Sequence, residues 1–121
     1  MLNNIRKNYE NAANILRIIS HPVRLAILDI LLTTEEECVC HMEAILGVRQ
    51  AYLSQHLMGL REAGIVVDRR DGRNIFYRIN NKDLSILIGV TKSLANQETG
   101  LINYKAFGCD CPKCIKQIRV E

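Results

Sequence analysis

The chain has 121 residues, of which 48% are hydrophobic and 24% charged, and its formal net charge is +3. This length suits one domain, because single cores are typically built from about 100 to 150 residues. The composition excludes the low-hydrophobicity, high-charge class of disordered chains. The positive excess lies entirely within residues 49–78, which hold six arginines and three acidic residues. The arginine guanidinium group can form two parallel hydrogen bonds with a phosphate or with guanine. A segment rich in arginine is nevertheless an ordinary charged surface unless a DNA-binding motif accompanies it.

The apolar segments predict a soluble cytoplasmic protein with no membrane partner. The first six residues lack the charged region and the following apolar region of a signal peptide. The longest apolar stretch, residues 25–32, is interrupted by Asp29. It is far shorter than the roughly 20 residues that span a bilayer.

Two helices are predicted from the first 32 residues. Apolar residues recur every three or four positions over residues 5–20, which predicts an amphipathic helix. Pro22 suits the first turn of a second helix, where its missing N–H would have no helical partner in any case. Residues 23–32 are apolar on nearly every side, so this helix is predicted to be the buried centre.

A helix-turn-helix pair is predicted next. Thr34 and Glu37 have the spacing of a capping box, which would begin a short third helix that ends at Gly47. Residues 49–63 follow after a turn of a few residues and carry leucines at helical spacing, with Gly64 as the C-cap. Two helices joined this tightly are typical of the helix-turn-helix motif.

The sequence period then changes to that of strands. Residues 65–70 and 74–79 are rich in β-branched and aromatic residues and flank an Asp-Gly dipeptide, which is favoured in tight hairpin turns. These runs predict a two-stranded wing. Asn80 or Asn81 is predicted to cap a last helix, in which apolar residues keep helical spacing over residues 84–95.

Five motifs, in this order along the chain, resemble the ArsR/SmtB family of metal-sensing repressors. They are Ser20-His21-Pro22-Val23-Arg24-Leu25-Ala26-Ile27-Leu28, Glu37-Cys38-Val39-Cys40, Gln50-Ala51-Tyr52-Leu53-Ser54-Gln55-His56-Leu57, Leu60-Arg61-Glu62-Ala63-Gly64-Ile65-Val66 and Arg69-Arg70-Asp71-Gly72-Arg73. The resemblance covers about residues 10–95. It implies a winged helix-turn-helix homodimer joined through its N- and C-terminal helices, and a transcriptional repressor that releases operator DNA when an inducer binds.

We therefore expect a mainly α fold with a small β-hairpin. Residues 1–95 would form the DNA-binding and dimerisation domain. Residues 96–121 would form a cysteine-containing C-terminal tail, which the common family pattern does not cover.

DNA contacts are expected from the recognition helix and from the wing. Residues near the start of the second helix of the motif reach base edges in the major groove. Wing arginines that flank the turn would project together from its tip onto phosphates or into the minor groove. The predicted DNA-binding residues are Arg49, Gln50, Ala51, Tyr52, Ser54, Gln55 and His56 from the helix, and Arg69, Arg70 and Arg73 from the wing.

The five cysteines form two groups, Cys38 with Cys40 and Cys109 with Cys111 and Cys114. Their odd number, without a secretion signal, favours metal or redox chemistry over a disulfide framework. Residues i and i+2 lie about 200° apart on an α-helix, so a Cys-x-Cys pair chelates one ion only where a helix has not properly begun. The start of the third helix is such a place, and the helix dipole there favours thiolate.

Two thiolates make an incomplete site, so a further ligand is expected from the tail. We predict a metal site that joins Cys38 and Cys40 to one or more of Cys109, Cys111 and Cys114, across the dimer. A separate site made of the three tail cysteines alone is the alternative. Soft sulfur ligands select As(III), Cd(II), Pb(II) or Zn(II), and no organic cofactor is expected. His41, beside the first pair, is interpreted as a surface residue.

The sequence leaves two alternatives to the metal-responsive repressor. The same scaffold would serve as a thiol redox or persulfide sensor if two cysteines bond on oxidation. The alternative from another class of protein is a thiol oxidoreductase, or an interaction module that is stabilised by zinc bound to the tail. The Cys-Pro-x-Cys arrangement of thiol oxidoreductases needs a βαβ context, and only seven residues follow Cys114. We therefore expect no enzyme activity.

Overall fold

The computed structural model describes residues 2–95. Within this part the chain forms five helices and three strands, in the order α1 (Leu2–Ile19), α2 (Pro22–Thr34), β1 (Glu36–Cys38), α3 (Val39–Leu46), α4 (Gln50–Glu62), β2 (Val66–Asp71), β3 (Asn74–Ile79) and α5 (Leu84–Leu94). The tail cysteines Cys109, Cys111 and Cys114 lie outside the described residues. The proposed domain boundary after residue 95 therefore stays a prediction.

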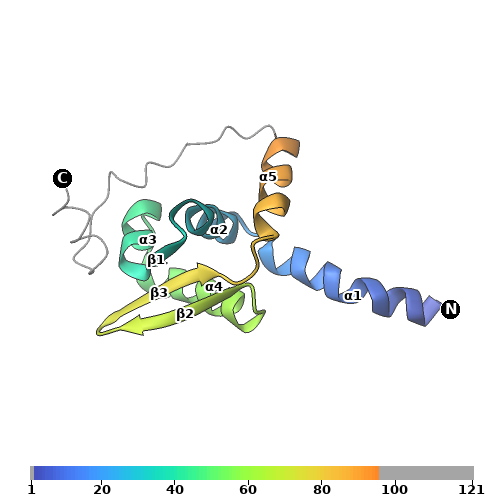
Figure 1. Ribbon diagram of the computed structural model, residues 1–121, viewed down its shortest axis with the longest axis horizontal. Helices are drawn as coiled ribbons and strands as arrows, with labels where there is room; N and C mark the ends of the chain where they lie inside the picture. The colour runs from blue at the N-terminus through green and yellow to red at the C-terminus, as the bar shows by residue number, and fades with distance from the viewer. Residues whose placement is uncertain (1, 96–121) are drawn as a thin grey trace.

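The core forms where α2 meets the helix-turn-helix pair and the sheet (Figure 1). Side chains from α2 and α4 are fully buried there, as the apolar pattern predicted, and they are Ile27, Leu28, Ile30, Leu31, Leu53, Leu57 and Leu60. Burying a side chain of this size stabilises the fold by about 1.5 to 3 kcal/mol. The three leucines of α4 therefore fix which face of that helix is turned outward.

The turn between α3 and α4 is short because Gly47 ends α3 in the left-handed conformation, with φ of +65°. Its N–H donates to the carbonyl oxygen of Glu43 at 2.9 Å. Glycine adopts this conformation without the steric cost that a Cβ brings. The predicted helix-turn-helix is confirmed.

The predicted hairpin is confirmed, but the sheet has three strands and not two. β2 and β3 pair antiparallel up to Asp71 opposite Asn74, which leaves a two-residue turn that begins at Gly72, with φ of +61°. β1 pairs antiparallel with the other edge of β3, so the strand order is β1-β3-β2. A strand of three residues is too short to show a period, and two of its residues are glutamates, which strands disfavour.

Thr34 and Glu37 do not form the possible capping box, because they lie on different elements and α3 begins at the cysteines, as the expected thiol site required. Thr34 is the last residue of α2 and donates its hydroxyl to the carbonyl oxygen of Ile30 at 2.9 Å. Glu35 then takes a positive φ of 69°, which ends the helix and turns the chain into β1. Pairing with β3 thus replaces the helical turn that the box would have begun, and α3 starts later, with Cys38 as its N-cap.

The predicted cap of the last helix also differs from the structure. Asp83 occupies the N-cap position of α5 and makes no side-chain capping bond. Asn81 lies two residues earlier, where its Oδ1 accepts the N–H of Asp83 at 2.9 Å. The asparagine stabilises the turn that leads into the helix and leaves the first turn of α5 uncapped by a side chain.

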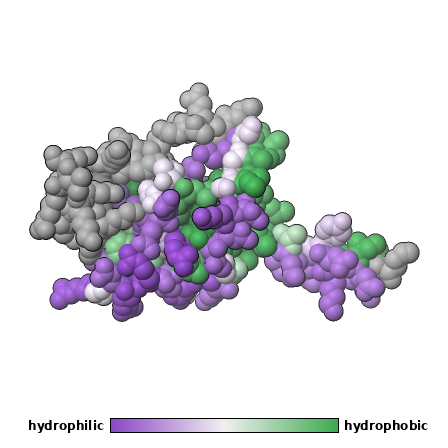
Figure 2. Space-filling view, viewed as in Figure 1, coloured by the Kyte–Doolittle hydropathy of each residue, from purple (hydrophilic) through white to green (hydrophobic). Residues whose placement is uncertain are grey.

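The two end helices carry apolar side chains that the described chain leaves exposed. α1 extends away from the rest of the molecule, and α5 carries hydrophobic surface, green in the space-filling view (Figures 1 and 2). These exposed side chains are Leu2, Ile5, Tyr9, Ile15 and Leu16 on α1, and Ile86, Val90 and Leu94 on α5. No helix among the described residues is both long and apolar enough to cross a membrane.

Candidate nucleic-acid interface and thiol site

The first half of α4 presents an outward face beside its buried leucines. Gln50, Ala51, Tyr52 and Gln55 are exposed, and Ser54 is half-buried. Amide and hydroxyl groups on such a face pair with base edges or phosphates in a major groove. The exposed Arg49 is the N-cap of this helix, so its side chain lies at the helix entry, where a phosphate would approach.

Met58 extends this face and was not among the predicted DNA-binding residues. It lies four and seven residues after Ser54 and Ala51, so it shares their side of the helix, and its side chain is 48% exposed. A methionine within a run of leucines carries no sequence signal that separates it from core. Apolar contact with a thymine methyl group is the chemistry that such a residue offers to DNA.

His56 differs from the other predicted contacts because protein groups surround its ring. Its Nδ1 accepts a hydrogen bond from Nε of Arg24 at 3.1 Å. Its ring centroid lies 4.3 Å from that of His21 and 4.7 Å from that of Tyr52. Burial, with the nearby charges of His21 and Arg24, lowers the pKa of His56 below its usual value.

Arg70 and Arg73 are two of the exposed cationic side chains of the wing. Both are exposed, and Arg73 lies in the turn between β2 and β3. Within residues 2–95, neither side chain forms an ion pair with an acidic group. Cations placed in this way at a hairpin tip are suited to phosphates.

Arg69 does not project from the tip with the other two, so that expectation is wrong for this residue. Its Nη2 and Nε donate to the two carboxylate oxygens of Glu36 at 2.6 and 2.9 Å. Its guanidinium carbon lies 4.4 Å from the centre of the Phe76 ring. The hydrogen bond to Glu36 raises the pKa of Arg69 above its usual value. A carboxylate on β1 and an aromatic face therefore hold this arginine across the sheet.

Cys38 and Cys40 lie together at the start of α3, as predicted. Their Sγ atoms are 2.8 Å apart, with Cys38 fully buried and Cys40 half-buried. The Sγ of Cys38 also accepts the N–H of His41 at 3.3 Å, which makes this cysteine the N-cap of the helix.

The donor set of this pair fits a soft ion but supplies only two ligands. Two sulfurs that share one tetrahedral ion at about 2.3 Å each lie about 3.8 Å apart, so these two would separate by about 1 Å. Among the described residues, no group of three histidine, cysteine, aspartate or glutamate side chains could hold a metal ion. The tail cysteines that were predicted to complete the set lie outside the described part.

His41 is buried, with 5% of its surface exposed, so the interpretation as a surface residue is wrong. Its Nδ1 lies 2.9 Å from Oε1 of Glu37, which is itself 1% exposed. The error arises because α3 begins immediately after β1. Its first turn therefore packs against the interior, and Val39 and Met42 are buried beside His41.

The sheet register joins the thiol pair to the wing. Cys38 on β1 is opposite Phe76 on β3, and Phe76 is opposite Arg69 on β2. Directly opposed residues of antiparallel strands point to the same face of a sheet. Cys38, Phe76 and Cys40 form an apolar cluster separate from the main core, and the guanidinium of Arg69 lies over its aromatic ring.

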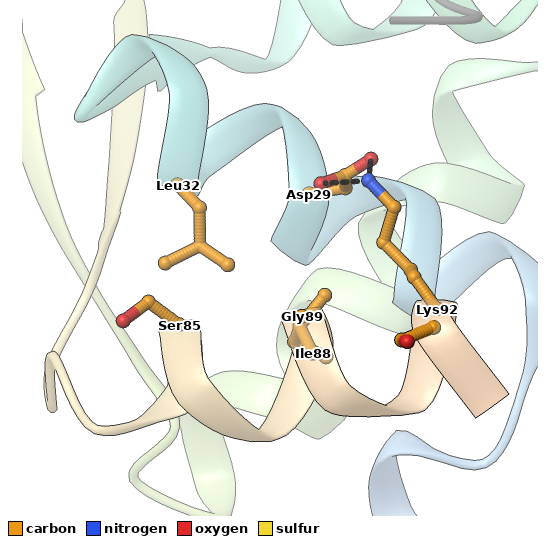
Figure 3. A pocket seen from close by; sticks show the side chains of 7 residues that line it. Asp29, Leu32, Ser85, Ile88, Gly89 and Lys92 are labelled. Atoms are coloured by element: carbon orange, nitrogen blue, oxygen red, sulfur yellow. Dashed lines mark hydrogen bonds and ion pairs between the residues drawn. The ribbon is translucent and has the colours of Figure 1, made fainter. Parts of the chain in front are cut away.

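A pocket of about 450 Å³ lies between α2 and α5, away from the cysteines. Figure 3 shows Lys92 reaching from α5 to the carboxylate of Asp29 on α2, where its Nζ is 2.9 Å from Oδ2. The remaining lining residues are Leu32, Ser85, Ile88, Gly89 and Ser93. Because its one carboxylate is bound to a lysine and its lining has no histidine or cysteine, this pocket is a poor site for a soft metal ion.

The helix-turn-helix, its outward polar helix face and the arginine-bearing hairpin define a winged helix-turn-helix DNA-binding protein. The chain belongs to the ArsR family. Residues 21–67 match the sequence profile of the bacterial regulatory protein, arsR family. Like the other members that it resembles, the protein is a transcriptional repressor.

Comparison with individual proteins gives the same assignment. The chain is 39% identical over 84 residues to the biofilm growth-associated repressor of Xylella fastidiosa, covering 69% of this chain and 73% of that protein. It is 32% identical over 104 residues to the arsenical resistance operon repressor of Staphylococcus xylosus, covering 86% and 91%. The solved structure of HlyU from Vibrio cholerae N16961 superposes with a TM-score of 0.67 at 32% identity, covering 75% of this chain and 98% of that one.

Proposed function

We propose that this repressor releases its operator when Cys38 and Cys40, together with cysteines of the tail, bind a thiophilic ion. The ion is As(III), Cd(II), Pb(II) or Zn(II), and the tail ligands come from Cys109, Cys111 and Cys114. The observation that carries the proposal is the 2.8 Å separation of the two Sγ atoms at the first turn of α3. Two soft donors held this close by consecutive backbone elements can share one ion.

The similarity to an arsenical repressor supports a metal or metalloid ligand. The match to the arsenical resistance operon repressor covers 104 residues of this chain, whereas only 95 residues precede the tail. At least nine tail residues therefore belong to the matched region. The match to the biofilm growth-associated repressor covers 84 residues and can therefore lie entirely before the tail.

The geometry of β1 supplies a route from the thiols to the wing. The Sγ atoms have to separate before they can share one tetrahedral ion, and Cys38 is fully buried against Phe76. Any movement of Cys38 therefore shifts β1 or the Phe76 ring, over which Arg69 lies. Glu36, two residues before Cys38, would carry the same movement to Arg69 through their bidentate contact.

The DNA contacts proposed for the reduced protein are those of the helix face and the wing. Arg49, Gln50, Ala51, Tyr52, Ser54 and Gln55 would enter the major groove, while Arg70 and Arg73 would hold phosphates. His56 and Arg69, although predicted as contacts, are engaged with Arg24 and Glu36. We assign to them the support of the contacting surfaces.

We further propose that the working unit is a homodimer in the cytoplasm, where its operator DNA lies. The exposed apolar side chains of α1 and α5 support this assignment, because patches of this kind mark surfaces that another chain covers. Two copies related by a two-fold axis would present two recognition helices to half-sites about one helical turn apart. A second chain would also bring its tail cysteines within the same assembly.

The test of ion binding is the ultraviolet absorption of thiolate-to-metal bonds. Adding Cd(II) or As(III) to the reduced full-length protein should produce such a band for the wild type. The band should weaken strongly in Cys38→Ser and in Cys40→Ser, because each serine removes a soft donor. The triple variant with Cys109, Cys111 and Cys114 replaced by serine should bind more weakly, with fewer sulfurs per ion. Full binding and full DNA release in this triple variant would contradict the shared site.

A thiol redox or persulfide response is the second candidate, and the same short contact favours it. Two thiols whose sulfurs lie 2.8 Å apart need little movement to form a disulfide. Oxidation by a peroxide would join the two sulfurs, with the two electrons passing to the peroxide and the thiol protons leaving. Failure of both ions to give an absorption band, together with loss of DNA binding on oxidation alone, would establish this candidate in place of the first.

A further inference from the structure

Arg24 on α2 connects α1 to the recognition helix α4. Its Nη1 donates to the carbonyl oxygen of Ile18, near the end of α1, at 2.9 Å. Its Nε donates to Nδ1 of His56 on α4 at 3.1 Å. The side chain is half-buried, so both hydrogen bonds are partly shielded from water. One guanidinium thus connects the last turn of α1 to the middle of α4.

Gly59, three residues after His56, makes room for this guanidinium. A Cβ placed on Gly59 would lie 2.6 Å from Nη2 of Arg24, which is closer than real Cβ contacts. Glycine inside a helix costs about 0.5 to 1 kcal/mol relative to alanine. The glycine at this position of α4 therefore has a packing reason, which is the close approach of Arg24.

The hydrogen bond to His56 fixes the protonation state of that ring. Nδ1 accepts a hydrogen only when it carries a lone pair, so His56 is neutral and carries its proton on Nε2. The ring of His21 faces that of His56, and its Nδ1 accepts the N–H of Val23 at 3.1 Å as the N-cap of α2. A proton added to Nδ1 of His56 would therefore break its bond to Arg24 and face a cation.

We propose that Arg24, His56 and Gly59 form a latch that positions the recognition helix on the body of the protein, and that protonation of His56 releases it. Arg24 and His56 are positioning residues in this scheme, acting on the DNA surface of α4 through its orientation. The latch rests on the DNA binding of the family and is independent of the thiol site. Its consequence is that operator affinity falls as the pH falls.

The direction of this pH effect distinguishes the latch from simple charge. The charged and titratable groups that face His56 are Arg24 and His21 from α2 and Tyr52 from α4 itself. A protonated histidine near DNA would strengthen binding through attraction to phosphates. The latch requires the opposite result, because the proton removes the acceptor that holds Arg24.

The same change affects folding stability. The pKa of His56 is lowered from 6.5 in the folded chain, so the unfolded chain binds more protons between the folded value and 6.5. The stability that the neutral ring contributes is complete above pH 6.5 and is lost as the pH falls through the folded pKa. Acid therefore removes the hydrogen bond between Arg24 and His56 and lowers the folding stability over the same pH range.

The experiment uses the reduced full-length chain and a DNA duplex selected from a random pool for binding at pH 7.5. Between pH 7.5 and 5.5 we expect the dissociation constant of the wild type to rise severalfold but by less than about tenfold per latch, because a His56 pKa below 6.5 limits the proton linkage over this range. In His56→Asn the affinity should stay within about twofold over the same range, because the asparagine Oδ1 replaces the Nδ1 acceptor and does not titrate. His21→Asn is the matched control, since it keeps the N-cap and should retain the pH effect.

Gly59→Ala separates positioning from stability. Alanine should preserve or raise the thermal stability of α4, since it is the better helix former. It should nevertheless lower operator affinity about tenfold at pH 7.5, because its methyl group displaces the guanidinium. Arg24→Gln should lower affinity similarly and raise the pKa of His56 seen by NMR, whereas Arg17→Gln on α1 removes the same charge without either effect.

Two results would overturn the latch. One is wild-type binding that strengthens or stays constant from pH 7.5 to 5.5. The other is a pH dependence of His56→Asn equal to that of the wild type. Should Arg24→Gln fail to fold, His56→Asn and Gly59→Ala still decide the matter, because neither removes a buried apolar group.

Discussion

The arginines of residues 49–78 differ in whether an acidic side chain pairs with them. Arg61 pairs with Asp68, whose Oδ2 lies 3.1 Å from its Nη1, and Arg69 pairs with Glu36. Arg70 and Arg73 have no acidic partner among residues 2–95 and stand on the hairpin. The local charge excess therefore overstates the number of cations that are available to phosphate.

Replacing Arg73 by alanine should weaken operator binding and flatten its salt dependence. Each lost phosphate contact lowers the slope of log K against log salt by about 0.9, so a dimer that loses two contacts should lose nearly twice that. The measurement is a salt titration of operator affinity. Arg61→Ala is the control and should change the slope little, because Asp68 already neutralises that side chain. An unchanged slope for Arg73→Ala would remove this residue from the interface.

Sequence alone predicted which side of α4 faces outward better than it predicted the contacts of individual side chains. The leucine spacing of residues 53–60 fixed the outward face of α4, and all three leucines are fully buried. The hydrogen bonds of His56 and Arg69 were not predicted, because their partners, Arg24 and Glu36, lie 32 and 33 positions away in sequence. Hydrogen bonds between such distant positions leave no local pattern.

At the scale of elements, β1 is the feature that sequence did not indicate. The three residues of β1 place Cys38 beside Phe76 and Glu36 beside Arg69, and so bring the thiol site into contact with the wing. The helices and the hairpin were predictable from their periods, whereas β1 exists because β3 offers it a free edge. Backbone pairing of this kind outweighs the local preference for a capped helix.

Glu36→Gln should weaken the communication between thiols and wing without removing a ligand. The variant should keep its Cd(II) or As(III) absorption band, while the drop in operator affinity caused by the ion should shrink about fivefold, a coupling change of about 1 kcal/mol. Asp71→Asn is the matched control, since Asp71 lies 3.9 Å from Arg69 and makes no bidentate contact. Equal responses in Glu36→Gln and wild type would exclude the Glu36–Arg69 pair from this route.

At the scale of the whole molecule, charge and apolar surface are segregated. The excess positive charge occupies the recognition helix and wing, and the exposed apolar stripes occupy α1 and α5. The small net charge of +3 thus becomes a local patch, which a homodimer would present twice. The fold was predictable to this extent because helix periods and turn residues are local signals. The number of ligands at the thiol site was not predictable, because it depends on the geometry between segments that are distant in sequence.

The central claim is that ion binding at the thiols lowers operator affinity, and one measurement addresses it directly. Operator binding by the reduced full-length protein is followed by fluorescence anisotropy with and without As(III) or Cd(II). The account predicts that the ion raises the wild-type dissociation constant at least about tenfold, within the usual range of allosteric coupling, and leaves the Cys38→Ser, Cys40→Ser double variant unchanged. An equal rise in the double variant, or no rise in a wild type that has bound the ion, would contradict it.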